Sequence, residues 1–174
     1  MRSGTRLAVL AMLLFAAAAL ASSDNATIIA KFKEKDPRVA KAFDTAYGYV
    51  LFPTVGKGAI GIGGAHGKGQ VFEQGKQIGT STLNQVTVGF QLGGQAYHEV
   101  IFFKDKTALD DFKRGNFEMS AQASAVALNA RAAGDLPYNK GVAVATMAKG
   151  GLMYEASIGG QKFSYKPTEV VAKK

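Results

Sequence analysis

The stretch GAIGIGGAHGKGQVF, residues 58–72, has glycine at six of its fifteen positions, and most of the others are apolar. A glycine-rich run of this kind can cradle a phosphate group between a strand and a helix. It can also form the bends and close contacts of a strongly curved sheet. The first interpretation predicts a nucleotide site, and the second predicts a scaffold without one.

The nucleotide interpretation fails on the residues around the glycines. Gly56 to Gly61 matches G-x-G-x-x-G, but a dinucleotide site also needs a long helix after the last glycine, and more glycine and a strand-like run follow here. A P-loop needs Ser or Thr after Lys68, where Gly69 stands. It also needs a glycine five positions before Gly67, where Ile62 stands.

The sheet interpretation fits the spacing of the glycines. Gly61, Gly63, Gly67 and Gly69 share one parity, so one face of a strand here is almost without side chains. Such a face can accept a helix or a large aromatic ring in close contact, or it can leave a groove for an acyl chain. We favour close packing and keep the groove as the alternative.

The first 21 residues have the pattern of a secretory signal peptide. Two arginines precede an uncharged run, Leu7–Ala21, with small residues at Ala19 and Ala21. A membrane-spanning helix is the alternative, but it needs roughly 20 apolar residues and this run has fifteen. We expect cleavage between Ala21 and Ser22 and a periplasmic or secreted product. Loss of the two arginines lowers the net charge from +8 to +6.

The amino-acid composition of the chain excludes several kinds of catalytic and metal site. The chain has no cysteine, so it has no disulfide, no thiolate nucleophile and no site for lipoprotein acylation. Its two histidines, His66 and His98, occur in no H-E-x-x-H motif, and there is no G-x-S-x-G. We predict no catalytic residue, no metal and no cofactor, and hence no enzyme. The basic charge favours an acidic partner, and export makes nucleic acid the weakest candidate.

Hydrophobic periodicity predicts helices over residues 24–46, restarting at Asp36-Pro37, and over residues 105–115. Apolar and alternating runs predict strands in most of the remaining chain, with a hairpin turn in residues 73–79. The segment 116–134 fits a helix or a strand, and we favour a strand through about Leu128. The expected fold is a single α+β domain. A curved antiparallel β-rich sheet or partly closed barrel, residues 48–174, packs with a helical segment, residues 22–47.

Three details of the strands carry specific expectations. Pro53 cannot donate a ladder hydrogen bond, so its strand is expected at a sheet edge or to end there. Strict alternation in residues 85–92 places Val86 and Val88 on an apolar face, with Gln85 on the opposite face. The HEVIFF run, residues 98–103, is apolar throughout its second half, which indicates a strand inside the sheet.

Five basic residues fall within eleven positions of the first predicted helix, interrupted by Glu34 and Asp36. They form either an ordinary solvated face or an interfacial helix, whose cations meet anionic head groups while apolar side chains enter the membrane boundary. Three lysines in the glycine-rich turns would extend that surface. The predicted lipid-binding residues are Ile28, Ile29, Lys31, Phe32, Lys33, Lys35, Arg38, Lys41, Lys57, Lys68 and Lys149.

Four long blocks of the chain resemble the SYLF domain, a lipid-binding module also described as an actin-regulator domain in fungi. The blocks are YGYVLFPTVGKGAIGIGGAHGKGQVF, QVTVGFQLGGQAYHEVIFF, FKRGNFEMSAQASAVA and GVAVATMAKGGLMYEASIGGQKFSY. The resemblance extends over roughly residues 30–167. It implies an α+β fold, binding to phospholipids (phosphoinositides in eukaryotic members) and no catalysis.

The resemblance also implies that an amphipathic N-terminal helix and basic surface residues make the lipid contact, and residues 28–41 are the matching part. The signal-peptide pattern and the lack of an appended SH3 or FYVE region argue against actin and phosphoinositides as partners. The chain then resembles a bacterial envelope member. We predict a non-catalytic module that associates reversibly with anionic phospholipid membranes as a peripheral protein. The alternative is a structural or scaffolding envelope protein whose curved sheet binds a protein partner.

Overall fold

The computed structural model describes residues 24–60, 62–88, 95–115, 125–126, 128, 131–149 and 160–168. The predicted signal peptide and most of the strand expected over residues 116–128 lie outside these residues. A helix over residues 24–35 comes first. It is followed by α2 (Pro37–Thr45), β1 (Gly48–Ile60), β2 (Ile62–Glu73), β3 (Lys76–Val88), β4 (Gln95–Phe103), α3 (Lys106–Lys113), β5 (Val142–Ala148) and β6 (Gln161–Pro167).

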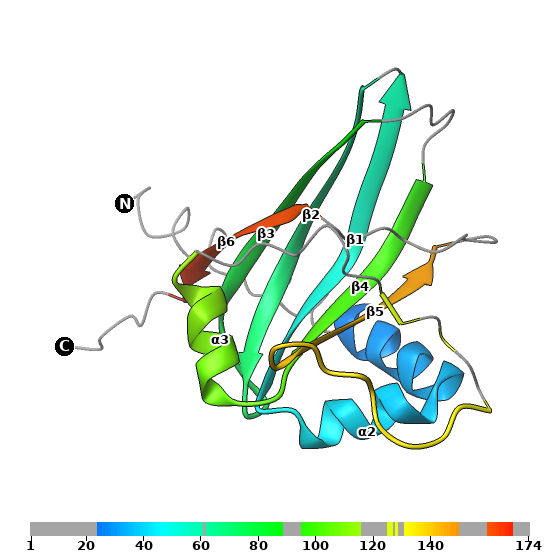
Figure 1. Cartoon of the computed structure of the whole chain (residues 1–174), viewed down its shortest axis with the longest axis vertical. Coiled ribbons are helices and arrows are strands. Elements are labelled where there is room, and N and C mark those ends of the chain that lie inside the picture. The colour runs from blue at the N-terminus through cyan, green and yellow to red at the C-terminus, as the bar shows by residue number, and fades with distance from the viewer. Residues whose placement is uncertain are drawn as a thin grey trace, which may run out of the picture.

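The six strands form one open antiparallel sheet in the order β5-β4-β1-β2-β3-β6. Helix α3 packs on one face of the sheet, and the helix 24–35 and α2 pack on the other (Figure 1). The predicted α+β class, the antiparallel sheet and the N-terminal helical segment are therefore confirmed. The internal position predicted for the HEVIFF strand is also confirmed, because β4 lies between β5 and β1.

The sheet is strongly curved toward the α3 side. The side-chain Nε2 of Gln161 in β6 donates to Oε2 of Glu99 in β4 at 3.0 Å, although three strands separate β6 from β4. In a flat sheet, strands four spacings apart lie roughly 19 Å from each other. The rings of Phe163 in β6 and Phe52 in β1 also approach, with centroids 5.9 Å apart. The concave face is consequently filled by side chains from both ends of the sheet.

The prediction for Pro53 was wrong. Pro53 lies within β1, which is flanked by β4 and β2, and not at a sheet edge. The register shifts at this point in both ladders, between Leu51 and Thr54 toward β2 and between Phe52 and Val55 toward β4. A bulge leaves a residue out of the regular pairing, so the missing N–H of proline is tolerated in a central strand.

Where the structure describes residues 85–92, Gln85 and Val86 lie on opposite faces as predicted, but the buried face is the one that carries Gln85. Gln85 is 3% exposed and Val86 is 76% exposed. The reason lies upstream in β3, where buried Leu83 is paired with Phe163 of β6. Because side chains alternate strictly, Gln85 must follow Leu83 onto the concave face, where its register partner is Gln161.

The glycine-rich strand β2 makes close contacts, as predicted. A Cβ atom at Gly69 would lie 2.7 Å from Cδ1 of Phe52 and 2.8 Å from the carbonyl oxygen of Leu51. At Gly67, a Cβ atom would lie 3.0 Å from Cγ2 of Val55. At these two positions the bare face receives neighbouring side chains, so close packing is confirmed there.

Local signals placed the turns and helix starts correctly. Gln74 and Gly75 both have positive φ, 48° and 77°, as a two-residue type I′ hairpin between β2 and β3 requires. Asp36 caps α2 by accepting from the backbone N–H of Arg38 at 2.9 Å. Asp105 caps α3 through the backbone N–H of Ala108 at 3.0 Å.

Candidate anion-binding cleft

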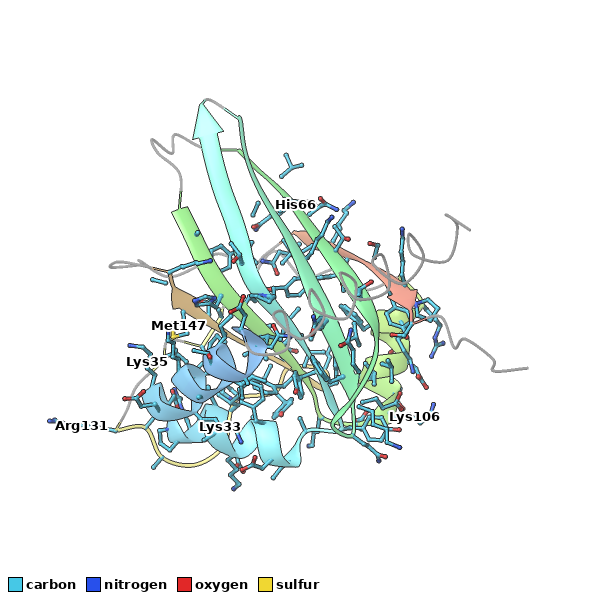
Figure 2. All side chains as sticks on the ribbon, turned by 180° about the vertical axis from the view of Figure 1, so that it is seen from behind. Lys33, Lys35, His66, Lys106, Arg131 and Met147 are labelled. Atoms are coloured by element: carbon cyan, nitrogen blue, oxygen red, sulfur yellow. The ribbon has the colours of Figure 1, made fainter. Side chains whose placement is uncertain are left out.

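A cleft of about 590 Å³ opens along one flank of the helix 24–35. Its other walls come from β1, β4 and the end of β5. Figure 2 shows Lys35 of the helix and Met147 of β5 on the same side of the molecule, and both line the cleft. Three lysines line it, Lys31 and Lys35 from the helix and Lys149 from the residue after β5. We call it the lysine cleft.

The packing of the helix fixes where its lysines point. Ile28 and Phe32, four residues apart, are buried in a cluster that includes Leu51 of β1. Lys31 and Lys35 are also four residues apart and therefore lie one above the other on the helix surface. Both are exposed, on the flank that faces the cleft. The buried pair thus anchors the helix and presents two ammonium groups together.

Lys149 reaches the same cleft from the opposite end of the sequence. Its backbone N–H donates to the carbonyl oxygen of Ala96 at 2.9 Å, which holds the residue beside β4. Its Nζ donates to Oγ1 of Thr54 in β1 at 2.9 Å. Lys68 is the register partner of Thr54 in β2 and is exposed, so a fourth cation stands next to the cleft.

His98 forms part of the cleft wall between these lysines. It is 7% exposed, and its Nδ1 donates to the carbonyl oxygen of Pro53 at 2.5 Å. Burial lowers the pKa of His98, and the charges of Lys149 and Lys31 lower it further, against the opposing effect of the Pro53 hydrogen bond. A histidine with a lowered pKa is neutral at pH 7, so the positive charge of the cleft comes from its lysines.

The lysine cleft has a marked excess of positive charge. Asp24 is the single carboxylate among its lining residues. Within the described part of the chain, neither Lys31 nor Lys35 forms an ion pair. Ammonium groups without a carboxylate partner are suited to phosphate oxygens, which accept hydrogen bonds from several donors at once.

The other predicted basic residues are placed elsewhere. Lys33 pairs with Asp44, Arg38 with Asp36 and Lys41 with Asp135, each at 2.7 Å. Arg38 and Lys41 line a separate hollow of about 560 Å³ between α2 and residues 135–138, which Lys104 also lines. The predicted basic run is therefore divided between two sites, and Lys33 lines neither of them. The side chain of Lys57 lies outside the described residues.

The predicted role of the apolar helix residues needs correction. Phe32 is fully buried and Ile28 is 8% exposed, while Ile29 is half-buried. Their apolar face already packs on the sheet, so in this arrangement Ile28 and Phe32 cannot enter a membrane. The amphipathic pattern of the helix reflects packing in the protein core, which gives the same periodicity as an interfacial helix.

The described residues contain no group of three His, Asp or Glu side chains arranged to hold a metal. No helix in the described ranges is both long and apolar enough to cross a bilayer. The sequence prediction included four of the residues that line the cleft and missed the others, among them the polar residues Thr54 and His98. His98 contacts Pro53, 45 residues away, and Thr54 contacts Lys149, 95 residues away, so no local pattern pointed to them.

A family model described as Ysc84, Las17-binding protein actin regulator, matches residues 84–169. Over these residues, just under half of the chain, the sequence is similar to the Ysc84 family. The Ysc84 model describes the SYLF domain, so the match confirms the SYLF resemblance. The Ysc84 match includes β4, α3, β5 and β6, and hence His98 and Lys149 of the lysine cleft, whereas Lys31 and Lys35 precede it.

A similar protein is "Beta cell expansion factor A" of Aeromonas veronii, which is 28% identical over 140 residues. The alignment covers 79% of this chain and 52% of that protein. The chain therefore spans about half the length of this relative.

Proposed function

We propose that this protein is a non-catalytic module that binds anionic phospholipid surfaces reversibly, with phosphate-bearing head groups entering the lysine cleft. The observation that carries the proposal is the convergence on one cleft of Lys31 and Lys35 from the first helix and of Lys149 from the residue after β5. The family's lipid-binding or actin-regulator role supports it at a coarser level.

The energetics of the cleft fit reversible binding. A lysine near an anionic membrane surface contributes about 1 kcal/mol. Three such contacts give about 3 kcal/mol, and Lys68 beside the cleft adds to this. A protein held in this way dissociates readily and is sensitive to salt, because exposed charges are screened beyond about 10 Å at 0.1 M ionic strength.

Vesicle sedimentation tests the proposal. The wild-type protein should sediment with phosphatidylglycerol vesicles, stay in solution with phosphatidylcholine vesicles, and be released by salt. The triple variant Lys31→Gln, Lys35→Gln, Lys149→Gln should bind phosphatidylglycerol vesicles about 100-fold more weakly, the equivalent of about 3 kcal/mol.

A matched control separates the cleft from net charge. The triple variant Lys33→Gln, Lys41→Gln, Lys113→Gln loses the same charge from lysines that already have carboxylate partners. Its affinity should fall less than about fivefold, because those ammonium groups are less available to a phosphate. Equal losses in the two triple variants would show that overall charge alone drives binding, and would contradict a role for the cleft.

A second candidate function comes from the family description, which names a Las17-binding actin regulator. In this case the chain would bind a protein partner and not a membrane, and its basic charge would keep it soluble. The same assay distinguishes the two functions. If the folded protein binds none of the anionic vesicles, the result would favour the protein-partner alternative.

We also propose that the protein acts outside the cytoplasm, in the periplasm or after secretion. The support is the charge and apolar pattern of residues 1–21. The natural ligand would then be an anionic phospholipid of a bacterial envelope. Mass spectrometry of the exported protein tests the location, with Ser22 expected as the first residue. Retention of residues 1–21 would contradict cleavage.

A further inference from the structure

A second, smaller pocket lies on the flank of the helix 24–35 that faces away from the lysine cleft. It has a volume of about 210 Å³. Asn25 and Ile29 line it from the helix, and Tyr49, Gln70, Phe72 and Gln77 line it from β1, β2 and β3. None of its lining residues carries a charge. We call it the amide pocket, because three of its side chains are carboxamides.

The sheet supplies the apolar part of this pocket. Tyr49, Phe72 and Gln77 are successive register partners in β1, β2 and β3, so their side chains form a row on one face. The rings of Tyr49 and Phe72 are stacked, with centroids 4.7 Å apart and planes 18° apart. Gln70 is two residues from Phe72 in β2 and therefore lies on the same face.

The helix supplies a polar group that lacks a full set of partners. Asn25 is 5% exposed, and its Nδ2 donates to Oε1 of Gln70. Its Oδ1 is buried and accepts no hydrogen bond from the described residues. A buried carbonyl oxygen without a donor costs about 1–3 kcal/mol. The pocket therefore presents amide groups at Gln70 and Gln77, and rotation of the Asn25 side chain would turn its unpaired acceptor toward a ligand.

This combination selects the chemistry of a ligand. A charged ligand is disfavoured because no lining residue could compensate its desolvation. A purely aliphatic ligand is disfavoured because it leaves Oδ1 of Asn25 without a donor. A sugar ring has hydroxyl groups that donate and accept, and C–H faces that pack on aromatic side chains. The volume, below the about 300–1,000 Å³ of sites for drug-sized ligands, limits the ligand to about one ring.

We propose that the amide pocket binds a neutral monosaccharide unit, either free or at the end of a glycan. The Asn25 side chain rotates so that its Oδ1 accepts from one hydroxyl, the amides of Gln70 and Gln77 bind others, and the Tyr49–Phe72 pair contacts the ring. This function is independent of phospholipid binding, since the helix 24–35 separates the pocket from the lysine cleft and the two sites share no lining residue.

The test is an NMR titration of the isotope-labelled protein with methyl β-glucopyranoside and with N-acetylglucosamine. At least one sugar should cause saturable shifts of the side-chain amide signals of Asn25, Gln70 and Gln77. Glycerol, which has hydroxyls without a ring, and cyclohexanol, which has a ring with one hydroxyl, should each bind at least fivefold more weakly.

Variants make the site assignment specific. Gln77→Ala should weaken sugar binding at least fivefold, and it changes an exposed side chain, so folding should be unaffected. The triple variant of Lys31, Lys35 and Lys149 should bind the sugar like the wild type. The proposal is overturned if neither sugar shifts the three amide signals up to about 50 mM, if glycerol binds as well as the sugars, or if Gln77→Ala has no effect.

Discussion

Replacement of Phe32 by Ala should lower the free energy of unfolding by about 3–5 kcal/mol, the range for a fully buried phenylalanine. Phe32 is the helix residue most deeply buried against the sheet, at 0% exposure. Its ring also lies 6.5 Å from that of Phe43 in α2, measured between centroids. The substitution therefore leaves a cavity where the helix 24–35, α2 and the sheet meet.

Urea unfolding measures this loss, and Ile29→Ala is the matched control on the same helix. Ile29 is only half-buried, so its truncation should cost less than about half as much. A loss below about 1 kcal/mol for Phe32→Ala would contradict the docked position of the helix. The lysine cleft depends on that position, because Lys31 and Lys35 line it only when the helix is packed on the sheet.

The same packing distinguishes two modes of membrane binding. Leu51→Ala should loosen the helix from the sheet without changing the helix itself, since Leu51 belongs to the buried cluster around Phe32. If the lysine cleft binds head groups, the loosened protein should bind anionic vesicles more weakly. If the helix instead leaves the sheet and inserts its apolar face, the loosened protein should bind more tightly, which would contradict the cleft.

A second large effect is expected from the buried carboxyl group of Glu99. Glu99 is fully buried on the concave face and accepts from Nε2 of Gln161 at 3.0 Å. Its other oxygen, Oε1, has no hydrogen-bond partner among the described residues. Burial raises the pKa of Glu99 to about 7, against the lowering effect of the Gln161 hydrogen bond. Burial and the nearby Glu99 charge both raise the pKa of Tyr97 as well.

The raised pKa makes stability depend on pH. Between pH 4.5 and pH 7 the unfolded protein has lost the Glu99 proton while the folded protein retains it. The folded state therefore binds more protons, and stability falls as the pH rises through this window. The contribution is fully present below pH 4.5 and is lost above pH 7. The total change is on the order of 3 kcal/mol, because one pKa unit corresponds to about 1.4 kcal/mol.

Glu99→Gln should remove this pH dependence, because glutamine cannot ionise. From pH 5 to pH 8, the Glu99 proton accounts for a loss of on the order of 3 kcal/mol in the free energy of unfolding of the wild type. The variant should not show this loss. Asp111→Asn is the control, since this exposed carboxylate lies on the surface of α3. Urea unfolding at both pH values provides the measurement. Identical pH profiles for Glu99→Gln and the wild type would show that Glu99 is ionised throughout.

Much of the local structure could be predicted because neighbouring residues determine it. Asp36-Pro37 specifies a helix start, and Gln74-Gly75 specifies a hairpin turn, whatever the rest of the chain does. Pro53 could not be placed correctly, because a central strand tolerates a proline here only where the pairing to both neighbouring strands is interrupted by a bulge. No local sequence pattern predicts that bulge. The buried position of Gln85 depends on Leu83 and Phe163, which pair across β3 and β6.

The candidate site was predictable in part for the same reason. The sequence identified Lys31, Lys35 and Lys149 as basic residues of a helix and of a turn. Only the fold shows that they share one cleft, and that Lys41 is paired with the distant Asp135. The amphipathic pattern of the helix could not decide between a membrane and the protein's own sheet, because both bury Ile28 and Phe32 with the same periodicity.

The central claim is that the lysine cleft receives an anionic head group. An NMR titration with dihexanoyl phosphatidylglycerol, kept below the concentration at which it forms micelles, tests this most directly. The account predicts saturable shifts centred on the side-chain signals of Lys31, Lys35, Lys149 and the ring of His98, with little change from dihexanoyl phosphatidylcholine. Shifts centred instead on Arg38, Lys41 and Lys104, or no shifts at all, would contradict it.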